Sequence, residues 1–540
     1  FTPDGEFLVL AFDNGKIEII STETFKLVKS FIGASNDVAS VDIKGQFLMV
    51  LGADDKINVF DMKQNFKKLY AATFTGSGEF VIANKEGFYY ASKGAINSIA
   101  FKKGTNVYPF EQFDLYYNRP DKAAENLVEL GIIDSVLTKA YYYAYLKRIK
   151  KMGFNEDELS GDFNLPEVTI NTNDIPVTVN KSNISIVVDA KDEIYNLDRI
   201  NIWINDIPVF GSKGKSIKNL NTKQVSESVN LLLTNGDNKV QVSVTNVKGA
   251  ESLKKTFKVN SNIIEEEPTL YLVSIGVSKY LNSEYDLKYA AKDAQDLSNY
   301  SKTLMDKYQK IETIELINEN VTTENVIKVK EQLLKTKVSD VVIVFFAGHG
   351  LIDKNLDYYL ATHDIDFKNP AKNGLSYENL EGLLDGIPAR KKLLLMDSCH
   401  SGEIDKDELE LINTEKSENK NITNRGTITA SNKSKKMGLK NSFELMQLLF
   451  ADLKRGTGAM VISSASGVEF AYEGEQWKNG VFTYALLEGL KTGNCDLNGD
   501  GNILVSEIRE YVIDKVSELT NGNQNPTSRK ENLEYDFSAW

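Results

Sequence analysis

Two short apolar runs in the second half of the sequence constrain most strongly what this chain can fold into. The first extends from Val341 to Ala347 and precedes Gly348-His349-Gly350. The second extends from Lys392 to Met396 and precedes Asp397-Ser398-Cys399. Such runs, bounded by glycine and polar residues, are typical of strands buried on both faces of a parallel sheet. Sites of open α/β sheets form at the carboxyl ends of strands, so we expect His349 and Cys399 to meet there as a catalytic dyad.

The chain offers few rivals to this pair, because it has two cysteines and three histidines. Cys495 lies in a polar loop with no histidine nearby. His400 directly follows Cys399, and neighbouring residues of an extended chain point to opposite faces. His363 closes another expected strand and is the weaker rival. The alternative without chemistry is a buried strand-end cysteine beside an unrelated histidine.

The two motifs, Gly-His-Gly at 348–350 and Asp-Ser-Cys-His-Ser-Gly at 397–402, resemble the caspase-like cysteine peptidases, in their bacterial and metacaspase-type branch. The spacing of about 50 residues from His to Cys is that of caspases, whereas the cysteine context differs from the Gln-Ala-Cys pattern of animal caspases. The resemblance covers about the last 270 residues. It implies Cys399 as nucleophile, His349 as proton shuttle, and the backbone N–H groups of Gly350 and Cys399 as oxyanion donors.

Acidic residues near the dyad predict the specificity. Asp397 lies two residues before Cys399, so both side chains leave the strand on one face, where a carboxylate would hold a substrate Lys or Arg. By resemblance, a second pocket acid comes from the first helix, at Asp293, and Ser463 and Ser464 form the pocket rim. The alternatives are a strand-end cap for Asp397 and a solvated helix-face charge for Asp293.

The region 268–540 alternates strands with helices and predicts a doubly wound α/β sheet. It is interrupted by a polar insert at about 403–442, whose composition cannot bury a core. If the pocket prefers Lys or Arg, the insert is a natural place for self-cleavage. Its exposed basic residues are Lys420, Arg425, Lys433, Lys435 and Lys436.

A second motif, at 496–507, matches the EF-hand loop pattern. Oxygen ligands for Ca²⁺ are expected from the carbonyl of Asn502 and from the side chains of Asp496, Asn498, Asp500 and Glu507. A stabilised turn without metal is the alternative. The peptidase chemistry itself requires no cofactor, so Ca²⁺ is the one candidate ion.

The sequence before residue 268 is rich in short strands. Residues 1–110 carry a repeat with an offset of 40 residues, in which Phe7 to Leu10 recurs as Phe47 to Val50. This predicts the tail of a WD40-like propeller, with a short irregular sheet as the alternative. Residues 111–162 predict a helical connector. Six strands within 163–264 predict an immunoglobulin-like sandwich, a spacer or recognition module.

Composition narrows the remaining options. The net charge is −13, from 63 basic and 76 acidic residues, without a basic cluster for nucleic acid. No apolar run reaches the length of a membrane span. Two cysteines fit a reducing compartment, so we expect a cytoplasmic protein. A secreted or periplasmic one stays open, because the chain begins at Phe1 and looks truncated.

Together these features predict a multidomain cysteine endopeptidase that cuts peptides after Lys or Arg. The N-terminal β modules would recruit a regulatory protein partner or gate the protease. The alternative function is a catalytically silent caspase-like scaffold, with or without a response to Ca²⁺. The intact His349 and Cys399 argue against this alternative, because a silent domain need keep neither.

Overall fold

The computed structural model describes most of the chain. The described residues are 1–74, 78–92, 94–95, 99–129, 135–171, 175–264, 267–353, 357–398, 422–424, 456–465, 471–529 and 536–540. They form two compact units. One comprises Phe1–Lys150, Phe154–Leu165 and Lys248–Glu251, and the other comprises Lys151–Gly153, Pro166–Val247 and Ser252–Trp540.

The first unit begins with two antiparallel sheets around a shared apolar cluster. Ile17 and Ile19 of the first sheet pack with Leu48 and Val50 of the second. The first sheet consists of β1 (Phe7–Ala11), β2 (Lys16–Ser21) and β3 (Leu27–Ile32). The second consists of β4 (Val38–Lys44), β5 (Phe47–Gly52), β6 (Lys56–Asp61), β7 (Lys67–Phe74), β8 (Phe80–Asn84) and β9 (Tyr89–Ala91).

The internal repeat of this region corresponds to two equivalent hairpins, β1–β2 and β5–β6. Each turn holds a residue in the left-handed conformation at the same place in the repeat, Gly15 with φ 79° and Asp55 with φ 58°. Propeller blades have four strands, whereas the second sheet has six. The described residues show antiparallel sheets and no closed propeller, so the propeller stays a prediction.

The helices of the first unit follow a short ribbon of β10 (Ala100–Lys103) and β11 (Asn106–Pro109). They are α1 (Asp114–Tyr117), α2 (Pro120–Glu129) and α3 (Ser135–Lys151). Proline at the first position of α2 is favourable, because its missing N–H would have no partner there. Helices therefore lie where the helical connector is expected.

The second unit begins with two sheets that enclose one apolar cluster. In β14 every second side chain is buried, as expected for a strand with one face on a core. One sheet holds β12 (Glu167–Ile170), β14 (Asn183–Lys191) and β18 (Gln224–Leu232). The other holds β13 (Thr178–Val179), β15 (Leu197–Ile204), β16 (Ile207–Pro208), β17 (Lys215–Ser216), β19 (Gly236–Asn246) and β20 (Lys255–Ser261). The immunoglobulin-like assignment stays a prediction.

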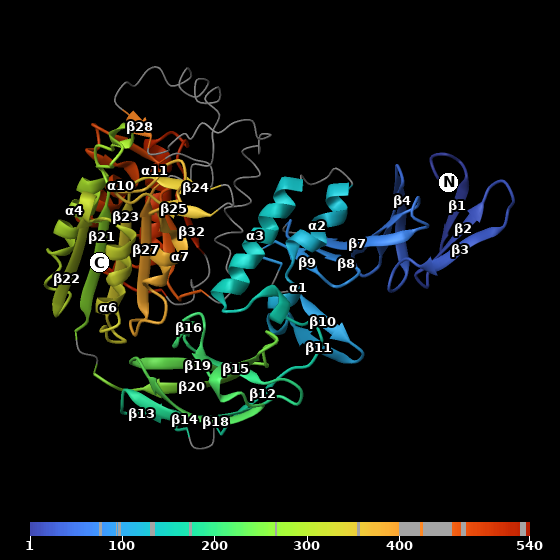
Figure 1. Ribbon diagram of the computed structural model, residues 1–540, viewed down its shortest axis with the longest axis horizontal. Helices are drawn as coiled ribbons and strands as arrows, with labels where there is room; N and C mark the ends of the chain where they lie inside the picture. The colour runs from blue at the N-terminus through green and yellow to red at the C-terminus, as the bar shows by residue number, and fades with distance from the viewer. Residues whose placement is uncertain are drawn as a thin grey trace. The chain divides into compact units, whose positions relative to one another are not determined.

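The rest of the second unit is built on a mostly parallel sheet with the strand order β22-β21-β23-β27-β29-β32 (Figure 1). Its last strand, β32, is antiparallel and was not expected from the sequence. All side chains of β23 are buried, which explains its uninterrupted apolar sequence. The strands are β21 (Thr269–Gly276), β22 (Lys310–Ile317), β23 (Val341–Ala347), β27 (Lys391–Asp397), β29 (Met460–Ser463) and β32 (Thr527–Arg529).

Helices cover this sheet in two groups. From the central strand β21 the chain first passes to β22 on one side and later crosses over to β23 on the other side. Crossover connections are right-handed, so connections in opposite directions place their helices on opposite faces of the sheet. Accordingly, α4 packs against α10 and α10 against α11, whereas α5 packs against α7. The helices are α4 (Ala290–Ser301), α5 (Thr323–Lys328), α6 (Lys330–Leu333), α7 (Tyr377–Gly382), α10 (Val481–Thr492) and α11 (Val505–Leu519). The mixed α/β sheet expected for this region is confirmed.

Two small antiparallel sheets accompany the central one. One consists of β24 (Gly350–Ile352), β25 (Tyr358–Leu360) and β26 (Leu375–Ser376), and the other of β28 (Ile422–Asn424), β30 (Tyr472–Gly474) and β31 (Asn479–Gly480). No helix among the described residues is both long enough and apolar enough to cross a membrane.

Candidate active site

The ends of β23 and β27 bring the two predicted motifs to one edge of the sheet. The strands are parallel neighbours (Figure 1). Ala347 pairs with Asp397. The N–H of Gly348 donates to the carbonyl of Asp397 at 3.3 Å. His349 therefore begins its loop beside the segment that leads into Cys399. Cys399 itself lies outside the described residues, so the dyad stays a prediction.

The imidazole of His349 has a defined orientation. The residue is 4% exposed, and its Nε2 lies 2.8 Å from the main-chain carbonyl of Tyr285. A carbonyl can only accept a hydrogen bond, so this contact requires the proton on Nε2. The lone pair of the ring is then on Nδ1. A main-chain carbonyl thus orients this imidazole, a role that a third side chain has in catalytic triads.

Aromatic rings surround this histidine and limit its access to water. The ring of Tyr280 lies 5.2 Å from the imidazole and that of Phe367 5.9 Å, measured between centroids. Phe367 also stacks on Tyr285 at 3.7 Å with an interplanar angle of 17°. The N–H of His349 donates to the hydroxyl of Tyr280 at 3.2 Å. Both the ring and the backbone of His349 are therefore held by the segment that follows β21.

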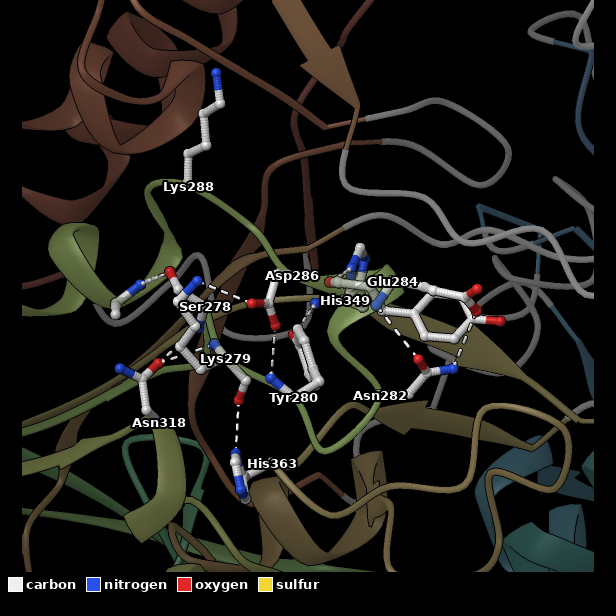
Figure 2. A network of polar contacts seen from close by, with 12 residues as sticks. Ser278, Lys279, Tyr280, Asn282, Glu284, Asp286, Lys288, Asn318, His349 and His363 are labelled. Atoms are coloured by element: carbon white, nitrogen blue, oxygen red, sulfur yellow. Dashed lines mark hydrogen bonds and ion pairs between the residues drawn. The ribbon is translucent and has the colours of Figure 1, made fainter.

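A polar network braces that segment (Figure 2). The amide oxygen of Asn318 accepts hydrogen bonds from the N–H groups of Ser278 and Lys279, at 2.9 and 3.1 Å. Asp286 accepts from the N–H of Tyr280 at 2.9 Å and from the ammonium of Lys279 at 2.8 Å. The network fixes the segment on both sides of Tyr285, whose carbonyl orients His349. Sequence patterns did not single out these residues.

The pKa of the Asp286 carboxyl reflects this network. Burial opposes ionisation, but the hydrogen bonds from Lys279 and Tyr280 outweigh it and hold the pKa below its usual value. A carboxyl with a depressed pKa contributes to stability above its unfolded pKa and loses this contribution as the pH falls through its folded pKa. The brace is therefore fully charged at neutral pH.

The rival residues have other roles. Nδ1 of His363 lies 2.7 Å from the carbonyl of Lys279, so this histidine adds to the same brace (Figure 2). Cys495 is fully buried, and its pKa is raised to about 12, first by desolvation and then by Glu488 and Glu507. A reactive cysteine needs the opposite shift. Neither rival has the environment of a catalytic dyad.

Two predicted pocket acids, Asp397 on β27 and Asp293 on α4, form hydrogen bonds with the beginning of α10. Asp397 is fully buried, and its Oδ2 accepts a hydrogen bond from the hydroxyl of Thr483 at 2.5 Å. Asp293 is also fully buried, and its Oδ1 accepts from the side chain of Asn479 at 2.8 Å and from the N–H of Gly480 at 3.1 Å. Asp293 is thus no solvated helix-face charge; it binds the segment that opens α10. A role for either acid in substrate binding stays a prediction.

The serines of the predicted pocket rim occupy neighbouring strand ends. Ser463, 5% exposed, pairs with Met396 across the β27–β29 ladder. The hydroxyl of Ser464 donates to the carbonyl of Ser398 at 3.1 Å. The Ser398 hydroxyl lies 2.9 Å from that of Tyr358. Gly350, a predicted oxyanion donor, begins β24 and pairs with Leu360.

The loop at 496–507 folds around Asp496. Its carboxylate accepts hydrogen bonds from the N–H groups of Gly499 at 2.8 Å and Gly501 at 2.9 Å. The Glu507 carboxylate accepts from the N–H groups of Asn498 and Leu504 at 3.1 and 2.9 Å. Within the described part of the chain, no three His, Cys, Asp or Glu side chains are arranged to hold a metal ion. The predicted Ca²⁺ site is therefore not shown.

Comparison with known proteins assigns the second half of the sequence. The family model of the caspase domain matches residues 271–538, so this region carries a caspase domain, and the match suggests a cysteine peptidase. The β-rich region before it has no family assignment. None of the curated proteins matches the sequence.

Two solved structures are similar to part of the chain. A crystal structure of a Geobacter sulfurreducens protein has 17% identity and a TM-score of 0.33, covering 48% of this chain and 93% of its own. The crystal structure of caspase-1 from Spodoptera frugiperda has 15% identity and a TM-score of 0.28, covering 49% of this chain and 86% of its own.

Proposed function

We propose that this protein is a cysteine endopeptidase that cleaves after Lys or Arg, with Cys399 as nucleophile and His349 as proton shuttle. The observation that carries the proposal is the fixed imidazole. Its Nε2 contacts the Tyr285 carbonyl, and the residue lies beside the strand end that leads to Cys399. A caspase domain over the same residues supports the assignment to cysteine peptidases.

The proposed chemistry uses groups of this chain only. A protonated imidazole beside a thiol favours the thiolate, which attacks the substrate carbonyl. The N–H groups of Gly350 and Cys399 would stabilise the oxyanion, and one such donor contributes about 3 kcal/mol. His349 then protonates the leaving amine from Nδ1, while its Nε2–H continues to donate a hydrogen bond to the Tyr285 carbonyl.

The proposed specificity rests on Asp397. Asp397 is a fully buried carboxylate at the catalytic edge and has lost its hydration. A cationic substrate side chain is favoured there, because it would give this carboxylate a charge-assisted hydrogen bond in place of water. Asp293 and Ser463 are proposed as further pocket residues because they lie on elements next to the same edge. Aspartate before the cleaved bond, the other option for a caspase-like enzyme, would be repelled by this charge.

Fluorogenic peptides ending in Arg, Lys or Asp test the proposal. We expect hydrolysis after Arg and Lys, complete loss in Cys399→Ala, and nearly full activity in the matched control Cys495→Ala. Hydrolysis after Asp would keep the dyad and contradict the pocket. If no peptide is cleaved under any condition, the silent scaffold becomes the better description.

We also propose Ca²⁺ as a ligand of the loop at 496–507. The loop offers only oxygen donors, which suit Ca²⁺, but Glu507 would have to exchange its backbone partners for the ion. Calorimetric titration of the full chain should give one binding event that Glu507→Gln abolishes. Equal heats for the wild type and Glu507→Gln would mean that the loop is a stabilised turn without a Ca²⁺ site.

For the N-terminal β modules, WD40-like and immunoglobulin-like, we propose recognition of a protein partner. Deleting residues 1–150 should then leave the hydrolysis of short arginyl peptides unchanged and weaken the cleavage of a protein substrate. An equal loss on both substrates would contradict a recognition role.

A further inference from the structure

Glu473 is a buried charge that the proposed chemistry does not use. It lies in the middle of β30 and is 1% exposed. Its Oε1 accepts a hydrogen bond from the N–H of Lys288 at 2.8 Å, and its Oε2 accepts one from the N–H of Tyr289 at 3.2 Å. A carboxylate is unfavourable at this depth unless such bonds replace its water, so the contact is a specific one.

The partners of Glu473 lie where helix α4 begins. Tyr289 is the N-cap residue of α4, and the first N–H groups of a helix lack partners within the helix. In many helices a glutamate three residues after the N-cap binds the N–H of the N-cap residue. In α4 that place is taken by Lys292, and Glu473 binds this N–H instead, from 184 positions along the chain. Its negative charge also suits the positive end of the helix dipole.

The segment that Glu473 binds is the one that orients His349. Tyr285, whose carbonyl contacts Nε2 of His349, lies three residues before Lys288. The contacts of Asp286 hold the beginning of this segment, and Glu473 holds its end. So short a stretch of chain has little slack, and a displacement of its end therefore moves the Tyr285 carbonyl. Hydrogen bonds weaken steeply when their angle departs from linear, so the imidazole would lose its fixed orientation.

β30 is itself fixed to the opposite side of the candidate site. The N–H of Tyr472 donates to the side-chain carbonyl of Gln524 at 2.9 Å, and the amide nitrogen of Gln524 donates to the Ser464 carbonyl at 2.7 Å. The Ser464 hydroxyl donates to the carbonyl of Ser398, directly after β27, at 3.1 Å. β30 therefore joins the strand ends at the catalytic edge to the segment before α4.

From this geometry we propose that Glu473 is a positioning residue for the imidazole of His349. It acts through the main chain of residues 285–289. By fixing the beginning of α4 against β30, it holds the Tyr285 carbonyl where Nε2–H donates to it, which keeps the lone pair of the ring on Nδ1. The inference rests on the proposed function, in which His349 moves protons at Nδ1, and adds to it a residue from the chain after the polar insert.

Glu473→Gln is the sharpest variant, because it keeps the size of the side chain and replaces one acceptor oxygen with an amide NH₂ group. One of the two backbone N–H groups then faces a donor. For an arginyl peptide we expect kcat to fall about 10- to 100-fold, since a small misplacement of a catalytic group is costly. KM should stay within about two-fold of the wild type, because the charge of the pocket is unchanged.

The matched control is Glu475→Gln, in the same hairpin. The Glu475 carboxylate lies 3.5 Å from the ammonium of Lys288, and both side chains are exposed, 58% and 62% respectively. Exposed ion pairs of this kind contribute little. The control removes an equal charge beside the same lysine but leaves the backbone N–H groups bound, so kcat and KM should both equal those of the wild type.

NMR of the histidine rings, in the full chain labelled with nitrogen-15 histidine, gives a readout that does not depend on activity. The neutral tautomers of an imidazole differ in which nitrogen carries the proton, and the ring-nitrogen shifts distinguish them. The chain has three histidines, so the signals of His349 are identified by their loss in His349→Gln. We expect the Nε2–H form in the wild type and in Glu475→Gln, and a mixture of both forms in Glu473→Gln.

A Glu473→Gln protein that unfolds at lower urea concentration, yet keeps the kcat and the His349 signals of the wild type, would overturn the inference and leave Glu473 as a helix cap. If Glu473→Gln does not fold, Glu473→Asp takes its place. It keeps the charge but is one methylene shorter, so the same changes are expected at smaller size, and their absence would be equally decisive. If the wild type cleaves no peptide, the proposed function fails, whereas the His349 signals still decide the positioning role.

Discussion

The two ends of β27 differ in what they do with a buried charge. At the amino end, Lys392 is fully buried, and its ammonium donates to the main-chain carbonyls of Leu384, at 3.2 Å, and Thr457. At the carboxyl end, Asp397 is equally buried and accepts from the hydroxyl of Thr483. The lysine thus joins three segments through carbonyls, whereas the aspartate lies at the strand end that pairs with Ala347, two residues before His349.

The difference shows that burial alone does not identify a functional charge. Desolvation lowers the pKa of Lys392 to about 8, a shift that often accompanies catalysis. Yet its position at the amino end of a parallel strand is opposite to where sites of such sheets form. We infer that Lys392 stabilises the fold and that Asp397 selects the substrate. The following predictions test this contrast.

The largest effect is expected from Asp397→Asn. The substitution keeps the shape and an acceptor for Thr483 but removes the charge, so kcat/KM for arginyl peptides should fall about 100-fold. For peptides ending in citrulline, a neutral isostere of arginine, kcat/KM should change little. The ratio of the two rates is the measurement, and a parallel loss on both peptides would assign Asp397 a structural role.

Lys392→Met should show the reverse pattern. It leaves the carbonyls of Leu384 and Thr457 without their donor, so the free energy of unfolding should decrease by about 1–3 kcal/mol, read from urea titration. The ratio of arginyl to citrullinyl hydrolysis should stay as in the wild type. A changed ratio would mean that the amino end of β27 communicates with the pocket.

The pH dependence of stability gives a subtler test of Lys392. Its folded pKa, about 8, lies below the value of about 10.4 for an unfolded lysine, so between these values the unfolded state binds more protons. Stability therefore rises with pH in this window. Relative to Lys392→Met, the wild type should gain on the order of 1–2 kcal/mol between pH 7.5 and 9.5. A constant difference would show that the lysine is neutral or hydrated throughout.

Local sequence patterns were sufficient to predict β23 and β27, because these two central strands are buried almost throughout. The run expected at Val341 to Ala347 is β23 without change. The helix ends were not predictable in the same way: α5 and α6 are separated at Val329, and α4 ends at Ser301. Helix ends depend on tertiary contacts, which a periodic pattern does not record.

Within the candidate site, the sequence predicted only residues whose side chains are themselves reactive. His349 was singled out by its glycines and by the scarcity of histidine, whereas the Tyr285 carbonyl that orients it has no side-chain signature. The brace depends on contacts of Asn318 with residues 40 and 39 positions away and on contacts of Asp286 with residues 7 and 6 positions away. β32 escaped notice because three residues are too few for a pattern.

The smallest expected effect concerns Asp293, the second predicted pocket acid. Its contacts with Asn479 and Gly480 resemble those of a helix cap, so Asp293→Asn should lower the free energy of unfolding by about 1 kcal/mol. If Asp293 also faces the substrate, the preference for arginine over citrulline should fall as well, because its charge adds to that of Asp397. A stability loss with an unchanged preference would assign the pocket charge to Asp397 alone and make Asp293, like Lys392, a buried charge that serves the fold. Measuring both quantities on the same protein separates the two outcomes, because capping acts on unfolding and pocket charge acts on kcat/KM.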